Sequence, residues 1–168
     1  MTDFASAFGR GQRAAEDAAR AREEVNSVLQ RLRQQVSEAT KGAIDITVER
    51  DPLNVLSQIA LTLSNRDEPE VATKAIYARN LIALNQPRVA LGRFEMPVEG
   101  FPCVVSFGRQ EERCHDSVAL EKAFEAMLQD AAIGRRLHGL LAEPKGQSPS
   151  VEVLDAPAQA SDKAADGS

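Results

Sequence analysis

Four side chains in this sequence are suited to catalysis or soft-metal binding: Cys103, Cys114, His115 and His138. A structural zinc site usually presents paired ligands two to four positions apart. The close pair here, Cys114 and His115, is adjacent, and adjacent residues on a strand point to opposite faces. The spacing therefore does not predict a metal site. A small, buried hydrophobic role is the ordinary one for a free cysteine.

A cysteine nucleophile would need a nearby base, and Cys114 is the better candidate. It precedes a predicted helix N-terminus, a position that lowers the pKa of a thiol, and His138 or His115 would be the base. However, no glycine motif of the oxyanion-hole type surrounds either cysteine, and helix capping already explains Asp116-Ser117. A small hydrolase or transferase that uses Cys114 with a histidine is therefore the alternative hypothesis.

The remaining polar clusters fit a solvated surface. Gly9 and Gly11 follow no strand and lack the third glycine of a phosphate-binding loop. The carboxylate groups fall in predicted turns or on solvent-facing strand positions, at 67–70, 95–99 and 111–112. We therefore assign no catalytic, cofactor-binding or metal-binding residue and expect no cofactor or small-molecule ligand.

Composition and charge limit the class of partner. The 168 residues carry a net charge of −5, and no segment forms a basic stripe, so nucleic-acid binding is only a third hypothesis. Two cysteines do not make a secreted disulfide scaffold. The N-terminus lacks a basic and then apolar signal sequence, and no apolar run has the length of a membrane span. A cytoplasmic location without membrane contact is the expectation.

The first 42 residues predict one long helix, from Asp3 to Lys41. The segment has no proline, and its apolar stripe follows a heptad with steps of four and three. Gly42 is placed to end the helix with a left-handed cap. With Phe8 at position a, the stripe comprises Phe4, Phe8, Gly11, Ala15, Ala18, Arg22, Val25, Leu29, Leu32, Val36 and Ala39.

The two halves of this helix differ in composition. Residues 25–39 have large aliphatic side chains in the stripe and are expected to pack in the core of the domain. Residues 1–24 have glycine, alanine and one arginine there, and are expected to project from the body or to form an oligomer. The candidate partner interface comprises Phe4, Phe8, Ala15, Ala18, Arg22 and Val25.

Residues 43–142 predict an α+β body. Alternation at Ile44, Ile46 and Val48 is typical of a half-buried antiparallel strand. Further strands of a meander with four to six strands are expected at 71–78, at 89–96 with a bulge at Gly92, at 101–107 and at 113–115, with a polar turn at 108–112. Residues 53–64 fit both helix and strand patterns, and we favour a helical turn followed by a strand.

Helix signals return near the end of the body. Asp116-Ser117 is expected to cap a helix that reaches Ala131, and residues 133–141 continue it or restart it near Gly134. Residues 143–168 have the polar, proline-containing composition of a disordered tail. Helices 25–41 and 117–141 are expected to cover one face of the sheet. The sequence thus favours a non-enzymatic interaction protein, an adaptor, regulator or assembly subunit, that self-associates or binds a protein partner through its first helix.

Overall fold

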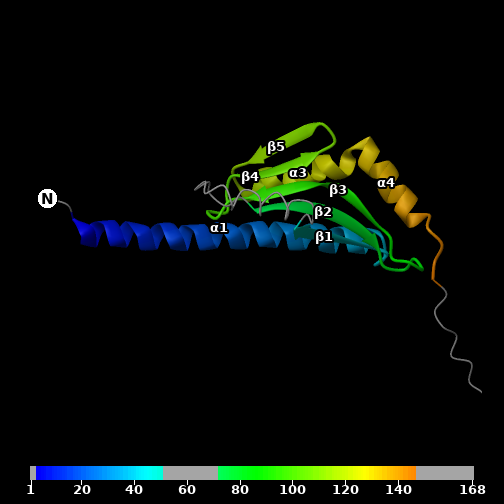
Figure 1. The fold of residues 1–168 in the computed structure, drawn as a ribbon, viewed down its shortest axis with the longest axis horizontal. Coiled ribbons are helices and arrows are strands. Elements are labelled where there is room, and N and C mark those ends of the chain that lie inside the picture. The colour runs from blue at the N-terminus through cyan, green and yellow to red at the C-terminus, as the bar shows by residue number, and fades with distance from the viewer. Residues whose placement is uncertain (1–2, 51–71, 147–168) are drawn as a thin grey trace, which may run out of the picture.

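The computed structural model of the chain describes residues 3–50 and 72–146, and it has an α+β fold (Figure 1). A long first helix lies beside a five-stranded antiparallel sheet, and two helices follow the sheet in the chain. The expectations for 53–64, and for the tail beyond Gly146, lie outside the described residues. The elements are α1 (Phe4–Ala39), β1 (Ile44–Arg50), β2 (Ala72–Asn80), β3 (Arg88–Met96), β4 (Cys103–Phe107), β5 (Gln110–Cys114), α3 (Ser117–Gln129) and α4 (Ala131–Leu141).

The sheet is a meander in which strand order follows chain order, β1-β2-β3-β4-β5. Its register places Ile46 beside Ala78, and Phe94 beside Val105. Leu91 is an extra residue opposite the Ile76–Tyr77 step, which is the bulge expected near Gly92. The bulge lets both Leu91 and Phe94 face the core, although they are three positions apart.

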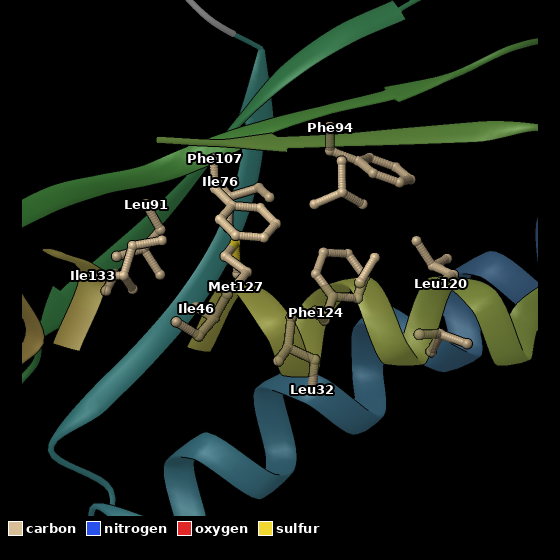
Figure 2. Packing of buried hydrophobic residues seen from close by; sticks show 14 of the residues in the cluster. Leu32, Ile46, Ile76, Leu91, Phe94, Phe107, Leu120, Phe124, Met127 and Ile133 are labelled. Atoms are coloured by element: carbon tan, nitrogen blue, oxygen red, sulfur yellow. The ribbon is translucent and has the colours of Figure 1, made fainter. Parts of the chain in front are cut away.

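All three described helices pack on one face of the sheet, as the sequence predicts. α1 contacts β1 and α3, α3 also contacts β4 and β5, and α4 contacts β2 and β3. Figure 2 shows the sheet residues opposite those of the helices, with Phe94 facing Phe124 of α3 at a ring-centroid separation of 6.2 Å. The second half of α1 contributes Val25, Val28 and Leu32 to this core.

The end of α1 differs in detail from the expected glycine cap. The left-handed residue next to the helix is Lys41, with a φ of 53°, and Gly42 follows with a φ of 79°. The amide of Gly42 donates to the carbonyl of Ser37 at 2.7 Å, and that of Lys41 to Glu38 at 3.1 Å. This is the Schellman pattern, so the cap begins one residue earlier than predicted.

Two other boundaries also differ from the sequence prediction. The expected polar turn at 108–112 is only the two residues Gly108 and Arg109, because β5 already begins at Gln110. The break between the last helices lies at Asp130, not at Gly134. Asp130 accepts hydrogen bonds from the amides of Ala132 and Ile133, so it caps α4 and Gly134 lies inside the helix.

Candidate interaction surface on the first helix

The first half of α1 projects beyond the sheet and the other helices (Figure 1). Asp3 caps the helix by accepting hydrogen bonds from the amides of Ala5 and Ser6, both at 3.1 Å. From residue 3 to residue 17 every residue except Gly9 is exposed. Phe4 and Phe8 are 79% and 69% exposed, so two aromatic rings at the free end of the helix contact mainly solvent.

The body meets α1 at the loop between β3 and β4. A Cβ atom on Gly100 would lie 2.7 Å from the Cβ of Ala21, so the loop backbone packs directly on the helix at this point. Ala18 and Ala21 are half-buried, and the first fully buried residue is Val25. The covered part of the stripe therefore begins near Ala21.

The predicted interface residues divide at this boundary. Phe4, Phe8 and Ala15 lie together on the uncovered part of the stripe. Ala18, which is half-buried, lies at the edge of this part. Val25 is completely buried inside the chain, so it belongs to the core and is not available as a surface residue. We call Phe4, Phe8, Gly11, Ala15, Ala18 and Arg22 the projecting stripe.

Arg22 lies in the apolar stripe, but its charged group remains in solvent. Its Nε donates to the carbonyl of Ala18 at 3.3 Å, one turn earlier on the same helix. The side chain therefore lies along the helix surface and leaves no buried charge. Arg20 and Asp17 form an exposed ion pair at 3.5 Å on the outer face.

The two cysteines lie together, but neither is paired with a histidine. Cys103 on β4 is the direct partner of Cys114 on β5, and both are buried. Burial raises the pKa of Cys103 to about 12, and the neighbouring Cys114 adds to the shift. Burial likewise raises the pKa of Cys114 to about 11, with Glu112 and Asp116 as further causes. Because a nucleophile requires a thiolate, these shifts oppose catalysis at neutral pH.

The histidines lie outside this cysteine pair. Both His115 and His138 are exposed, and the Cys114 thiol donates to the carbonyl of Glu112 at 3.7 Å. In the described part of the chain, no three His, Cys, Asp or Glu residues gather closely enough to hold a metal ion. Within those same residues, no helix has both the length and the apolar character to cross a bilayer.

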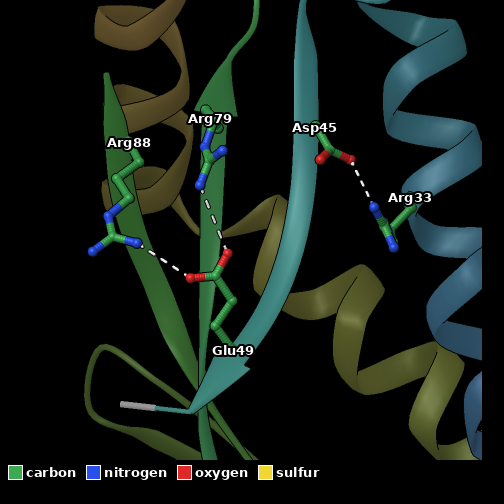
Figure 3. Close-up of polar contacts among 5 residues, drawn as sticks. All are labelled: Arg33, Asp45, Glu49, Arg79 and Arg88. Carbon is green, nitrogen blue, oxygen red and sulfur yellow. Dashed lines mark hydrogen bonds and ion pairs between the residues drawn. The ribbon is translucent and has the colours of Figure 1, made fainter. Parts of the chain in front are cut away.

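The sheet face opposite the helices is charged. Glu49 of β1 accepts from Arg88 at 3.2 Å and pairs with Arg79 at 3.7 Å, as Figure 3 shows. The guanidinium of Arg88 also lies 4.6 Å above the ring of Tyr77. Asp45 pairs with Arg33 of α1 at 3.4 Å, which links the first strand to the helix (Figure 3). These are exposed structural pairs and do not form a site.

One open groove of about 450 Å³ lies between α1 and α3. Val28, Leu32 and Phe124 form part of its apolar floor, and the ion pair of Arg31 with Glu121 crosses it. Neither the groove nor the cysteine pair follows from local patterns in the sequence. Both arise from contacts between distant segments, and only the alternation within β4 hinted at which side Cys103 would face.

Comparisons with protein-family models, with curated proteins and with solved structures found no match to this chain.

Proposed function

We propose that this protein is a non-enzymatic interaction protein that self-associates through the projecting stripe of α1. The observation that supports this most directly is the exposure of Phe4 and Phe8 on a helix whose later turns are buried by the body. A projecting amphipathic helix with exposed aromatic side chains is a common way to bind another helix. The role would be that of an adaptor, a regulator or an assembly subunit.

A reducing, cytoplasmic compartment fits this proposal. The sequence has two cysteines, which do not make the disulfide framework of a small secreted domain. Proteins with few cysteines are common in the cytosol, where thiols stay reduced. Nucleic acid is a poorer partner, because the net charge is −5 and acidic residues interleave with the arginines of α1.

Sedimentation velocity and light scattering over a range of protein concentrations would test self-association. The variant Phe8→Gln/Ala15→Gln places two polar side chains in the projecting stripe. Its matched control is Arg13→Gln/Arg20→Gln, with two glutamines in the same segment but on the outer face of the helix. Burying one phenylalanine contributes about 1.5–3 kcal/mol, so the stripe variant should weaken association at least about tenfold.

The control variant should associate nearly as well as the natural chain. A natural chain that is strictly monomeric at every concentration would overturn the self-association proposal. A hetero-partner that binds the stripe would then have to be identified. Equal weakening by both variants would also contradict it, because the effect would then not depend on the apolar stripe.

A further inference from the structure

The body of the protein restricts how a second copy can lie on the projecting stripe. From Val25 to Val36, the same stripe is fully or partly covered by the sheet and by α3 of its own chain. A parallel partner helix on this stripe would run toward the body and meet the β3–β4 loop at Gly100 (Figure 1). An antiparallel partner helix runs the opposite way, so each body lies beyond the free end of the other helix.

We propose, building on the self-association proposed above, that two copies pair residues 4–22 of α1 in an antiparallel arrangement. The two-fold axis would lie level with Arg13. In this register, Phe8 of one copy lies opposite Ala18 of the other, and Gly11 lies opposite Ala15. Position a thus meets position d, as in antiparallel coiled coils, and the ring of Phe8 has a small residue opposite it.

The flanks of the stripe favour a close approach of two helices. Positions e and g of this segment carry mainly alanine. Ala5, Gln12 and Ala19 occupy position e, and Ala7, Ala14 and Ala21 occupy position g. Small residues on both sides of a seam let two helix backbones approach near the lower end of the usual 8–10 Å range. A parallel dimeric coiled coil would instead use oppositely charged residues at these positions.

Charge favours the antiparallel direction. In the proposed register, Arg10 of one copy lies within about one residue's rise of Asp17 of the other on the same side of the pair, so the two opposite charges attract each other along the outer flank, and symmetry repeats this attraction. Asp17 is 70% exposed, and among residues 3–50 and 72–146 it pairs with the equally exposed Arg20 alone, so its carboxylate is accessible. A parallel pair would instead put Arg22 against Arg22 in the seam. An antiparallel pair shifted by one heptad toward the free ends would bring the two Arg10 side chains to within one residue of the same level, and a shift the other way would bring the Phe8 ring to the buried Val25.

The proposed overlap also accounts for the length of the uncovered stripe. Phe4 of one copy reaches the level of Arg22 of the other, where the β3–β4 loop packs on Ala21. This loop carries Val98, which is 59% exposed. The partner helix would therefore cover the stripe up to the point where the chain's own body begins to cover it.

Distances between spin labels in the full-length protein would test the direction and the register. Ser6, Arg13 and Arg20 share position f on the outer face, so Ser6→Cys, Arg13→Cys and Arg20→Cys are three matched labelling sites. The natural cysteines are buried, and the unsubstituted chain is the control that should take up little label. The antiparallel register predicts the shortest distance at Arg13, and equal, longer distances at Ser6 and Arg20, about 21 Å apart along the axis.

Each other result has a distinct meaning. Equal distances at all three sites would indicate a parallel pair and overturn this inference, but not self-association. Equal distances at Ser6 and Arg13 with a much longer one at Arg20 would overturn the register. A dimer by light scattering that gives no measurable coupling at any site would exclude this helix as the interface. A monomer in both measurements would overturn the proposed function itself.

Discussion

Cys103 and Cys114 face each other across the β4–β5 ladder, and both side chains are buried. The Cys103 thiol donates to the carbonyl of Gly100 at 3.0 Å. Two thiols that are close together would suggest redox chemistry or catalysis from proximity alone. Their surroundings oppose this, because burial stabilises the neutral form of each group and raises both pKa values above 10.

The first prediction is that both thiols are inert in the native protein near neutral pH. A pKa of about 11 or 12 leaves very little thiolate at pH 7.5. An aromatic disulfide reagent should therefore titrate fewer than a tenth of the thiols on a timescale of minutes, and both in denaturant. Rapid reaction of Cys114 in the native protein, with Cys103 protected, would revive the cysteine-dependent enzyme hypothesis.

The second prediction concerns stability at alkaline pH. An unfolded cysteine titrates near 9.0, whereas the folded pKa values are about 12 and about 11. Above pH 9 the unfolded chain thus releases protons that the folded chain retains, so the free energy of unfolding falls as pH rises. The slope is at most about 1.4 kcal/mol per pH unit for each thiol. Urea unfolding between pH 8 and pH 10.5 measures it.

The matched control for this titration is Cys103→Ala/Cys114→Ala. A lower overall stability at every pH does not affect the comparison, which concerns the slope. The variant should lose the part of the alkaline decline that the two thiols cause. Identical slopes for the two proteins would contradict the assignment to the cysteines.

The third prediction concerns Asn80, a buried polar residue at the end of β2. Its Nδ2 donates to the carbonyl of Leu140 at 2.7 Å, and its Oδ1 accepts from the amides of Ile82 and Ala83. One side chain thus joins the end of α4 to the loop after β2. Asn80→Ala leaves these buried groups without partners and should lower the free energy of unfolding by about 1–3 kcal/mol.

Chemical denaturation followed by circular dichroism checks this value. Asn85→Ala, at an exposed asparagine of the same loop, is the control and should change stability by less than about 0.5 kcal/mol. If both variants lose the same amount, the network around Asn80 is not the cause.

The fourth prediction concerns the cap of α1. Lys41 adopts a φ of 53°, which a side chain with a Cβ tolerates poorly, so Lys41→Gly should stabilise the protein by up to about 1 kcal/mol. Gly42→Ala should have the opposite effect, because Gly42 has a φ of 79° and alanine is strained there. Thermal unfolding of both variants measures whether each substitution raises or lowers stability. Lys41→Ala is the control for loss of the lysine side chain. A destabilising Lys41→Gly would contradict the cap.

Local patterns in the sequence were sufficient for much of the fold. The heptad from Phe4 to Ala39 predicts α1, and alternation at Ile44, Ile46 and Val48 predicts β1. The division of α1 into a covered and an uncovered half follows from side-chain size, because only residues 25–39 offer large aliphatic groups to a core. These features depend on neighbours within a few turns or strand positions.

The errors have two physical sources. β5 was predicted too short because residues 110–113 are all charged or polar, which is common for an edge strand that must not pair with another chain. The boundary between the last two helices was misplaced because two nearby residues, Asp130 and Gly134, can each interrupt a helix. Asp130 offers a side-chain acceptor that stops and restarts the helix, whereas Gly134 only lowers helix propensity.

Contacts between distant segments were not predictable from one sequence. The pairing of Cys103 with Cys114 depends on the register of β4 against β5, and a shift of one residue would separate the two thiols onto opposite faces. The candidate surface depends both on local sequence patterns and on contacts between distant segments. Its residues came from the heptad, but its limit near Ala21 comes from the loop at Gly100.

The position of α1 in the chain also has a consequence during synthesis. Arg31 of α1 pairs with Glu121 of α3, which is 90 positions later, so the core cannot close until most of the domain has been made. Until then, the ribosome-bound chain displays the whole apolar stripe of a 36-residue helix. Translation proceeds at about 5–20 residues per second, so this exposure lasts several seconds.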